Sequence, residues 1–286
     1  MIEFVRTYLG EMVQWGIDFA GTCAFFVALE TFAARKGARP SIGSRLKALV
    51  FWMVYGALII LIAHGLTTLW APLGIKPALA SLAPAHVPPL VGAAIGAIAA
   101  AYIGDFVYYW AHRAQHRFFW RFHAVHHSVR EMSGITGYHH FSEQLFQFVL
   151  YAIPLSFLID GPYTIPIVGV LLAQQGNYLH SPTWVNFGPL GRYFVDNRFH
   201  RIHHSIEARH YDRNFGLFTT LWDSVFGTAY FPAADEWPET GVVDYPEPQT
   251  VPQFLLAPFS ARFRGEAADA DAPAVQADPA LTTRAG

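Results

Sequence analysis

The chain has 286 residues, of which 53% are hydrophobic and only 14% are charged, whereas soluble globular proteins carry about 25% charged residues. Its 19 basic and 21 acidic residues leave a formal net charge of −2, so no positive excess is available for phosphate contacts, which argues against a nucleic-acid-binding protein. The single cysteine, Cys23, excludes an internal disulfide, a cysteine-ligated zinc site and an iron–sulfur cluster.

Three apolar stretches are long enough to cross a membrane as helices, because about 20 helical residues span the hydrocarbon core. They run from Ile17 to Ala34, from Ala48 to Trp70 and from Leu90 to Ala111. Buried helices of a soluble all-α protein are the alternative. The second stretch has no charged residue and lacks the polar stripe of such a helix, so we predict three membrane spans.

A fourth apolar region extends from Leu145 to Leu179 and is interrupted by Asp160-Gly161-Pro162. Proline ends helices and glycine permits a tight turn, so we predict two helices joined at this point. Each arm is short for a full crossing, and the sequence leaves open whether the hairpin spans the bilayer or dips into it. The fold prediction is an all-α integral membrane protein with four to five membrane-embedded helices and a cytosolic helical cap.

Basic residues alternate between the loops, and loops rich in Lys and Arg face the cytoplasm. The loop between the first two spans contains basic residues and no acid: Arg35, Lys36, Arg39, Arg45 and Lys47. The next loop contains only Lys76, and basic residues reappear after the third span at Arg113 and Arg117. We therefore predict that the N-terminus lies outside and that the chain after the third span, including the C-terminus, is cytoplasmic.

Histidines are concentrated after the third span. Of 14 histidines, 11 lie between His112 and His204, where even scatter would place roughly 4.6. Eight of them form three sets with helical spacing: His112 and His116, then His123, His126 and His127, then His200, His203 and His204. Residues three or four apart share one helix face. Imidazole suits iron, zinc, copper and nickel, and eight ligands are too many for one ion, so the pattern favours a binuclear redox centre. His210 is predicted to be a surface residue.

These motifs resemble the fatty acid hydroxylase/sterol desaturase superfamily of integral-membrane di-iron enzymes. The resemblance runs from about Gly92 to Tyr230. It rests on the stretch from Asp105 to His116, the two H-x-x-H-H triplets, and a C-terminal signature over 211–216 and 222–228.

The resemblance implies further site residues. The family's H-P-x-E histidine corresponds to His140, with His139 as the substitute, and Phe141 replaces the proline. A helix-end histidine corresponds to His180. The predicted metal ligands are His112, His116, His123, His126, His127, His140, His180, His200, His203 and His204. Carboxylates that could hydrogen-bond to ligating imidazoles are Asp105, Glu143, Asp196 and Asp223, and ordinary salt-bridge or capping roles are the alternative for the last three.

The implied function is a monooxygenase with two iron ions and O2 as co-substrate. It would hydroxylate or desaturate an unactivated C–H bond of a fatty acyl, sterol-like or carotenoid lipid, and the sequence does not decide between these reactions. Zinc can copurify, because imidazole sites bind it more tightly than ferrous iron. No haem-attachment or dinucleotide motif is present, so no tightly bound haem or flavin is expected. Electrons would come from an external reductase with a ferredoxin or small haem carrier.

A histidine-rich membrane metal transporter or metal-binding protein is the alternative, although a transporter's ligands should lie near the middle of the membrane.

The predicted organisation has four parts. Residues 1–91 form N-terminal membrane helices, 92–230 the catalytic region, 231–263 a Pro-rich extension and 264–286 a disordered tail.

Overall fold

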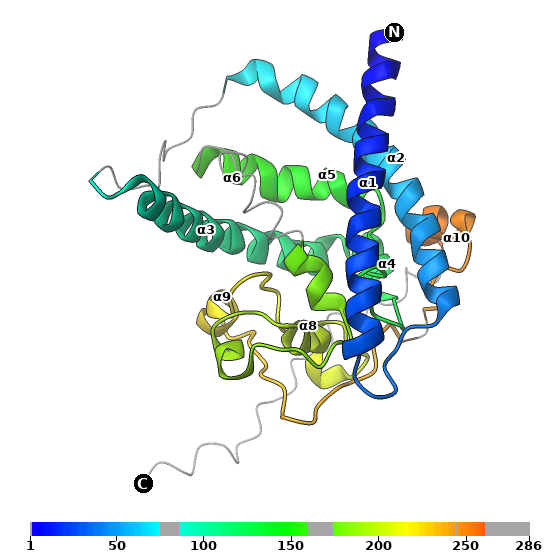
Figure 1. Ribbon diagram of the computed structural model, residues 1–286, viewed down its shortest axis with the longest axis vertical. Helices are drawn as coiled ribbons and strands as arrows, with labels where there is room; N and C mark the ends of the chain where they lie inside the picture. The colour runs from blue at the N-terminus through cyan, green and yellow to red at the C-terminus, as the bar shows by residue number, and fades with distance from the viewer. Residues whose placement is uncertain (1, 75–85, 159–173, 244, 261–286) are drawn as a thin grey trace.

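The computed structural model describes residues 2–74, 86–158, 174–243 and 245–260, and Figure 1 shows their arrangement. Within these residues the regular structure is helical, and only isolated β-bridges occur outside the helices. The long helices are α1 (Ile2–Ala33), α2 (Ile42–Trp70) and α3 (Pro89–Phe118). The shorter ones are α4 (Trp120–His127), α5 (Glu143–Gln147), α6 (Ile153–Leu158), α8 (Asn197–His203), α9 (Leu221–Val225) and α10 (Val251–Leu256).

The three predicted spans fall in α1, α2 and α3, each of which is long and apolar enough to cross a membrane, over Glu3–Ala33, Ile42–Leu66 and Ala94–Phe118. α1 begins 15 residues before the predicted start at Ile17. The residues before Ile17 are more polar, and for this reason the predicted apolar stretch did not include them. Exposed polar side chains such as Glu11 are nevertheless compatible with a helix. α3 continues past Ala111, and its last two turns hold His112 and His116.

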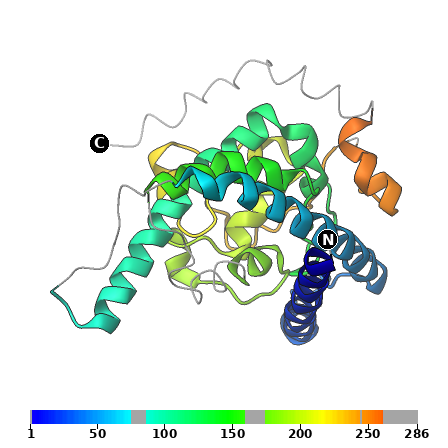
Figure 2. The ribbon, with the colours of Figure 1, turned by 90° about the horizontal axis from the view of Figure 1, so that it is seen from above.

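The long helices diverge from one another. In Figure 1 α1 runs vertically, whereas α3 runs across the view, and in Figure 2 α1 is seen nearly end-on. α1 and α2 are in contact, since the Tyr8 hydroxyl donates to the Ala57 carbonyl at 2.9 Å. Gly56 makes their close approach possible, because a Cβ there would lie 2.8 Å from the ring of Trp15.

The fourth apolar region is helical in both described parts. Residues 143–158 form α5, a π-helical turn over Phe148–Ala152, and α6. Residues 174–180 are helical and end at His180. The predicted turn at Asp160-Gly161-Pro162 lies outside the described residues, so the depth of this hairpin in the membrane stays a prediction.

A buried aromatic cluster connects α2 to the C-terminal segment. Phe51 stacks on Phe254 with ring centroids 4.6 Å apart and meets Tyr138 edge-on at 5.0 Å. The Tyr138 hydroxyl donates to Glu247, whose carboxylate also pairs with Lys47 at 2.8 Å. This packing fixes the segment after α4, which lies next to the histidines.

Candidate metal centre

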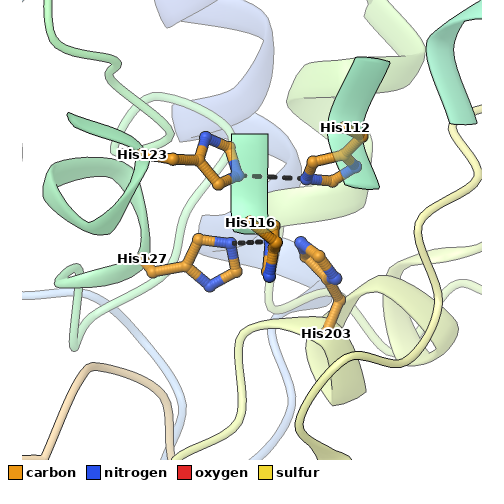
Figure 3. A group of neighbouring side chains, drawn as sticks. All are labelled: His112, His116, His123, His127 and His203. Atoms are coloured by element: carbon orange, nitrogen blue, oxygen red, sulfur yellow. Dashed lines mark hydrogen bonds between the residues drawn. The ribbon is translucent and has the colours of Figure 1, made fainter. Parts of the chain in front are cut away.

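Five imidazoles form one group, which we call group A. His112 and His116 come from α3, His123 and His127 from α4, and His203 from α8. One ring nitrogen of each lies within 4.8 Å of those of the other four. Figure 3 shows the five rings around a common centre, with His112 Nε2 3.0 Å from His123 Nε2 and His116 Nε2 3.2 Å from His127 Nε2.

Four further imidazoles form group B: His126, His180, His200 and His204. The Nε2 atom of His180 lies 3.2 Å from that of His126 and 3.2 Å from that of His200. The Nε2 atoms of His200 and His204 are 3.1 Å apart. The two groups adjoin, because the rings of His127 and His204 stack with centroids 4.3 Å apart. Nine of the ten histidines predicted as ligands thus lie in two neighbouring groups.

The helix register explains why the same triplet occurs twice. On α4, His123 and His127 are one turn apart and belong to group A, while His126 belongs to group B. On α8 and its C-cap residue His204 the assignment is reversed, since His200 and His204 belong to group B and His203 to group A. Each H-x-x-H-H triplet therefore contributes an i, i+4 pair to one group and its remaining histidine to the other.

Backbone carbonyls fix the tautomers of several of these rings. The Nδ1 atoms of His126 and His180 lie 3.2 Å from the Tyr138 carbonyl and 2.8 Å from the Gly176 carbonyl. A carbonyl only accepts, so each Nδ1 carries the proton and each Nε2 of a neutral ring presents a lone pair. The two Nε2 atoms face each other at 3.2 Å, and this approach repels unless a cation lies between them. The Nδ1 atoms of His112 and His203 likewise donate to the carbonyls of Phe215 and Arg213.

Near neutral pH, the cation between these facing nitrogens is not a proton. Burial, reinforced by neighbouring imidazoles, holds the pKa values of His126, His127 and His204 well below the usual histidine value. The donor set fits metal ions instead. Two imidazoles bound at right angles with bonds of about 2.1 Å place their nitrogens about 3.0 Å apart. Among the described residues, the buried Nε2 of His203 has no hydrogen-bond partner, as expected of a nitrogen that binds a metal.

Glu143 is the predicted carboxylate that contacts the clustered imidazoles. It accepts from His123 Nδ1 at 2.9 Å, from His139 Nδ1 at 3.1 Å and from Gln115. Burial raises the pKa of Glu143, but the adjacent His123 and His139 outweigh it and lower the pKa to about 2. The carboxylate is therefore ionised, and it holds His123 with its Nε2 directed toward group A.

The other three carboxylates accept mainly from backbone N–H groups rather than from an imidazole, and for Asp196 this is the alternative capping role. Asp105 was expected to reach His112, but it accepts from the backbone N–H groups of residues 217–219, and Asp223 accepts from those of 215 and 216. Together they hold the segment whose Phe215 carbonyl accepts from His112. Asp196 caps the N-terminus of α8 by accepting from the N–H groups of 198 and 199, which fixes the helix bearing His200 and His203.

His140 does not join either group, contrary to the prediction. Its Nδ1 lies 2.7 Å from the Ser142 hydroxyl and its Nε2 lies 3.2 Å from the Leu255 carbonyl, so both nitrogens have other partners. The segment before α5 is not helical, and consecutive side chains there point in different directions. His139 faces the centre instead, with its ring stacked on His126 at 3.8 Å and its Nδ1 on Glu143.

The sequence interpretation missed a turn between α8 and α9. Asp212 and Asn214 have positive φ angles of 55° and 62°, a conformation that Asp and Asn tolerate better than most residues. This turn directs the Arg213 and Phe215 carbonyls at His203 and His112, and places Asp212 Oδ1 3.5 Å from His116 Nδ1. The Asp-x-Asn pattern was the available signal. His210 is also buried rather than on the surface, between the Ser205 hydroxyl and Glu236.

Comparison with known proteins agrees with the resemblance. The family model described as fatty acid hydroxylase matches residues 97–228. The ornithine lipid hydroxylase OlsE of Rhizobium tropici is 34% identical over 168 residues, which is 57% of this chain and 50% of OlsE. The alkylglycerol monooxygenase of Caenorhabditis elegans is 31% identical over 142 residues, 49% of this chain and 28% of that protein.

The very-long-chain aldehyde decarbonylase GL1-4 of Oryza sativa subsp. indica is 30% identical over 138 residues, 43% of this chain and 22% of that protein. The chain spans half the length or less of these curated relatives. No solved structure matches. All nine histidines of groups A and B lie within residues 97–228, the region that matches the fatty acid hydroxylase family, and this match together with the curated relatives supports the resemblance to the fatty acid hydroxylase/sterol desaturase superfamily.

Proposed function

We propose that this chain is a membrane-bound di-iron oxygenase that hydroxylates or desaturates an unactivated C–H bond of a lipid-type substrate. The observation that supports the proposal most strongly is the pair of adjoining imidazole groups with lone pairs facing one another. His112, His116, His123, His127 and His203 would hold one iron ion, and His126, His180, His200 and His204 the other. When bound, the two ions supply the redox chemistry that activates O2.

The chain's own residues position and enclose this centre. The Nδ1 bonds of His126, His180 and His203 fix the lone pairs toward the ions, and Glu143 orients His123. The nine imidazoles are buried or nearly so, so bulk water is largely excluded from the metal face. Dry, preorganised sites protect reactive oxidants from side reactions.

The membrane helices support a lipid as the substrate. The two histidines on α3 lie at the end of a helix that could span the bilayer, so an apolar molecule could reach the centre without entering water. The named relatives act on lipids: an ornithine lipid, alkylglycerols and very-long-chain aldehydes. A fatty acyl, sterol-like or carotenoid molecule fits this description. We further propose a cytoplasmic centre, an N-terminus outside, and electrons from an external reductase chain.

Lipid profiling tests the activity. Lipids from cells with and without the chain are compared by mass spectrometry, with His203→Gln as the inactive variant. His210→Gln is the matched control, because His210 is a buried histidine outside both groups. We expect a lipid class that gains one oxygen atom or loses two hydrogens with the wild type and the control, but not with His203→Gln. Identical lipids in all samples, despite full metal content, would contradict the proposal.

A further inference from the structure

The segment from Arg35 to Lys47, which comprises the loop after α1 and the start of α2, contains basic residues of two kinds. Arg45 pairs with Glu30 and Lys47 pairs with Glu247, each at 2.8 Å. Arg35, Lys36 and Arg39 have no carboxylate partner among the described residues. Glu131 also approaches this segment, where its carboxylate accepts from the backbone N–H of Ser41 rather than from a basic side chain.

The three unneutralised residues share one cleft. An open cleft of about 500 Å³ is lined by Ala34, Arg35, Lys36, Gly37 and Arg39, none of which is acidic. Gly37 has a φ of 79°, which turns the chain back within the loop and gathers the three cationic residues. Lys36 and Arg39 are exposed, so their charged groups can reach a ligand in the cleft.

Residues from α8 extend this positive surface. Arg35 lies over the Trp237 ring at 4.6 Å, and Arg201 lies against the same ring at 4.4 Å. Burial and the nearby Arg198 lower the pKa of Arg35, a sign that like charges are crowded here. Arg201 is itself held in the fold, because its Nε donates to the Pro238 carbonyl at 2.7 Å, and the cluster of positive charge beside it favours an anion at this surface.

The cleft lies at the level of the membrane surface. It directly follows α1 and precedes α2, two helices that are long and apolar enough to cross a membrane, and Figure 1 shows the lower end of α1 beside α8. The loop is also fixed to the segment after His180, because the Arg35 N–H donates to the Pro182 carbonyl at 2.9 Å. At this level the abundant anions are phospholipid head groups.

We propose that Arg35, Lys36 and Arg39 form a binding site for the phosphate of an anionic phospholipid head group. Arg39 and Lys36 would contact the phosphate oxygens, while Arg35, held on Trp237, contributes positive charge from the wall. The indole of Trp237 suits the same position, since tryptophan favours the boundary between head groups and hydrocarbon. This site is separate from the metal groups, and it does not depend on the proposed oxygenase activity.

The test measures lipid retained by the detergent-purified full chain. Radiolabelled phosphatidylglycerol or phosphatidylcholine is added in trace amounts to the micelles, and lipid bound per protein is counted. Lys36→Gln/Arg39→Gln removes two charges from the cleft and leaves the Arg35–Trp237 contact intact. Arg117→Gln/Arg121→Gln is the matched control, because it removes two exposed charges outside the cleft. Metal content and melting temperature of each variant establish that it is folded.

We expect the wild type and the control to retain phosphatidylglycerol over phosphatidylcholine, and the cleft variant to bind it roughly tenfold more weakly. Equal retention by both variants, or no preference for the anionic lipid, would overturn the proposal. Competition by millimolar inorganic phosphate would show a site for free phosphate instead. Capture of a soluble acidic protein that depends on Lys36 and Arg39, without lipid retention, would assign the cleft to a protein partner.

Discussion

The imidazoles of His127 and His204 stack with ring centroids 4.3 Å apart and an interplanar angle of 20°, although they belong to different groups. His127 is the last residue of α4, and His204 caps the C-terminus of α8. This contact joins the two groups at the ends of two short helices. The two candidate metal sites therefore adjoin, as a centre in which two ions act on one substrate requires.

Each group should lose its own ion independently. His203→Gln removes a ligand from group A and His200→Gln one from group B, so each variant is expected to retain about one ion per chain. Metal analysis by mass spectrometry measures this, with His210→Gln as the control. If His200→Gln retained as much metal as His210→Gln, group B would not be a metal site.

His140 and His139 should behave differently. His140 bonds to Ser142 and Leu255, so His140→Gln is expected to leave the metal content unchanged and to reduce stability by about 1–2 kcal/mol. His139→Gln loses the bond to Glu143 and the stacking on His126, so it should reduce metal affinity. Chelator competition on the two purified variants distinguishes them, and the reverse order would restore His140 as the ligand.

Replacing Gly137 by alanine should disturb group B through His180. A Cβ at Gly137 would lie 2.9 Å from His180 Cγ, which is closer than van der Waals contact allows, so the imidazole must shift. We expect Gly137→Ala to weaken metal binding at group B by about 10-fold or more. Gly176→Ala is the control, because it lies next to the same histidine with nothing within 4 Å of its added Cβ. Equal metal content in both variants would contradict this account of His180.

Glu143→Gln should weaken metal binding without removing a ligand. The amide cannot accept from His123 and His139 as strongly as the carboxylate does, and loss of such support costs about 10- to 100-fold in metal affinity. Glu131→Gln is the control, since Glu131 is exposed and bonds to the Ser41 backbone. An affinity that is unchanged in Glu143→Gln would mean that the carboxylate is not needed to orient His123.

The metal-free chain should become less stable as the pH falls. Burial lowers the pKa of His180 to about 4 from the usual 6.5, and the pKa values of His200 and His204 are also lowered. Below pH 6.5 the unfolded chain binds more protons than the folded chain, so stability is lost as the pH falls from 6.5 toward 4. The melting temperature of the chelator-treated protein, measured between pH 8 and 5, should decrease below about pH 6.5. A melting temperature independent of pH would contradict burial of these imidazoles in the neutral form.

The sequence predicted the parts of the centre that depend on helical spacing. His123 and His127 are four residues apart on one helix, so their common direction follows from the geometry of α4 alone. The family pattern added His180 at a helix end. The three apolar stretches likewise located α1, α2 and α3, because the number of consecutive apolar residues shows whether a helix is long enough to cross the hydrocarbon core.

The remaining features depend on contacts that no local pattern records. His139 and His140 are adjacent in a non-helical segment, and only the packing of Tyr138 and Phe254 decides which ring faces the centre. Asp105 was placed on the right helix face, but its partners are more than 110 residues away in the chain. The backbone carbonyls of Arg213 and Phe215 accept from His203 and His112. Every residue has a backbone carbonyl, so no residue type in the sequence indicates these contacts.

The most direct test of the central claim is the iron content of the purified chain after anaerobic loading with ferrous iron, combined with Mössbauer spectroscopy. We expect two iron ions per chain, each in a nitrogen-rich environment and magnetically coupled to the other. Fewer than two ions in the folded wild-type protein, or two ions with no magnetic coupling after oxidation, would contradict a centre shared by groups A and B.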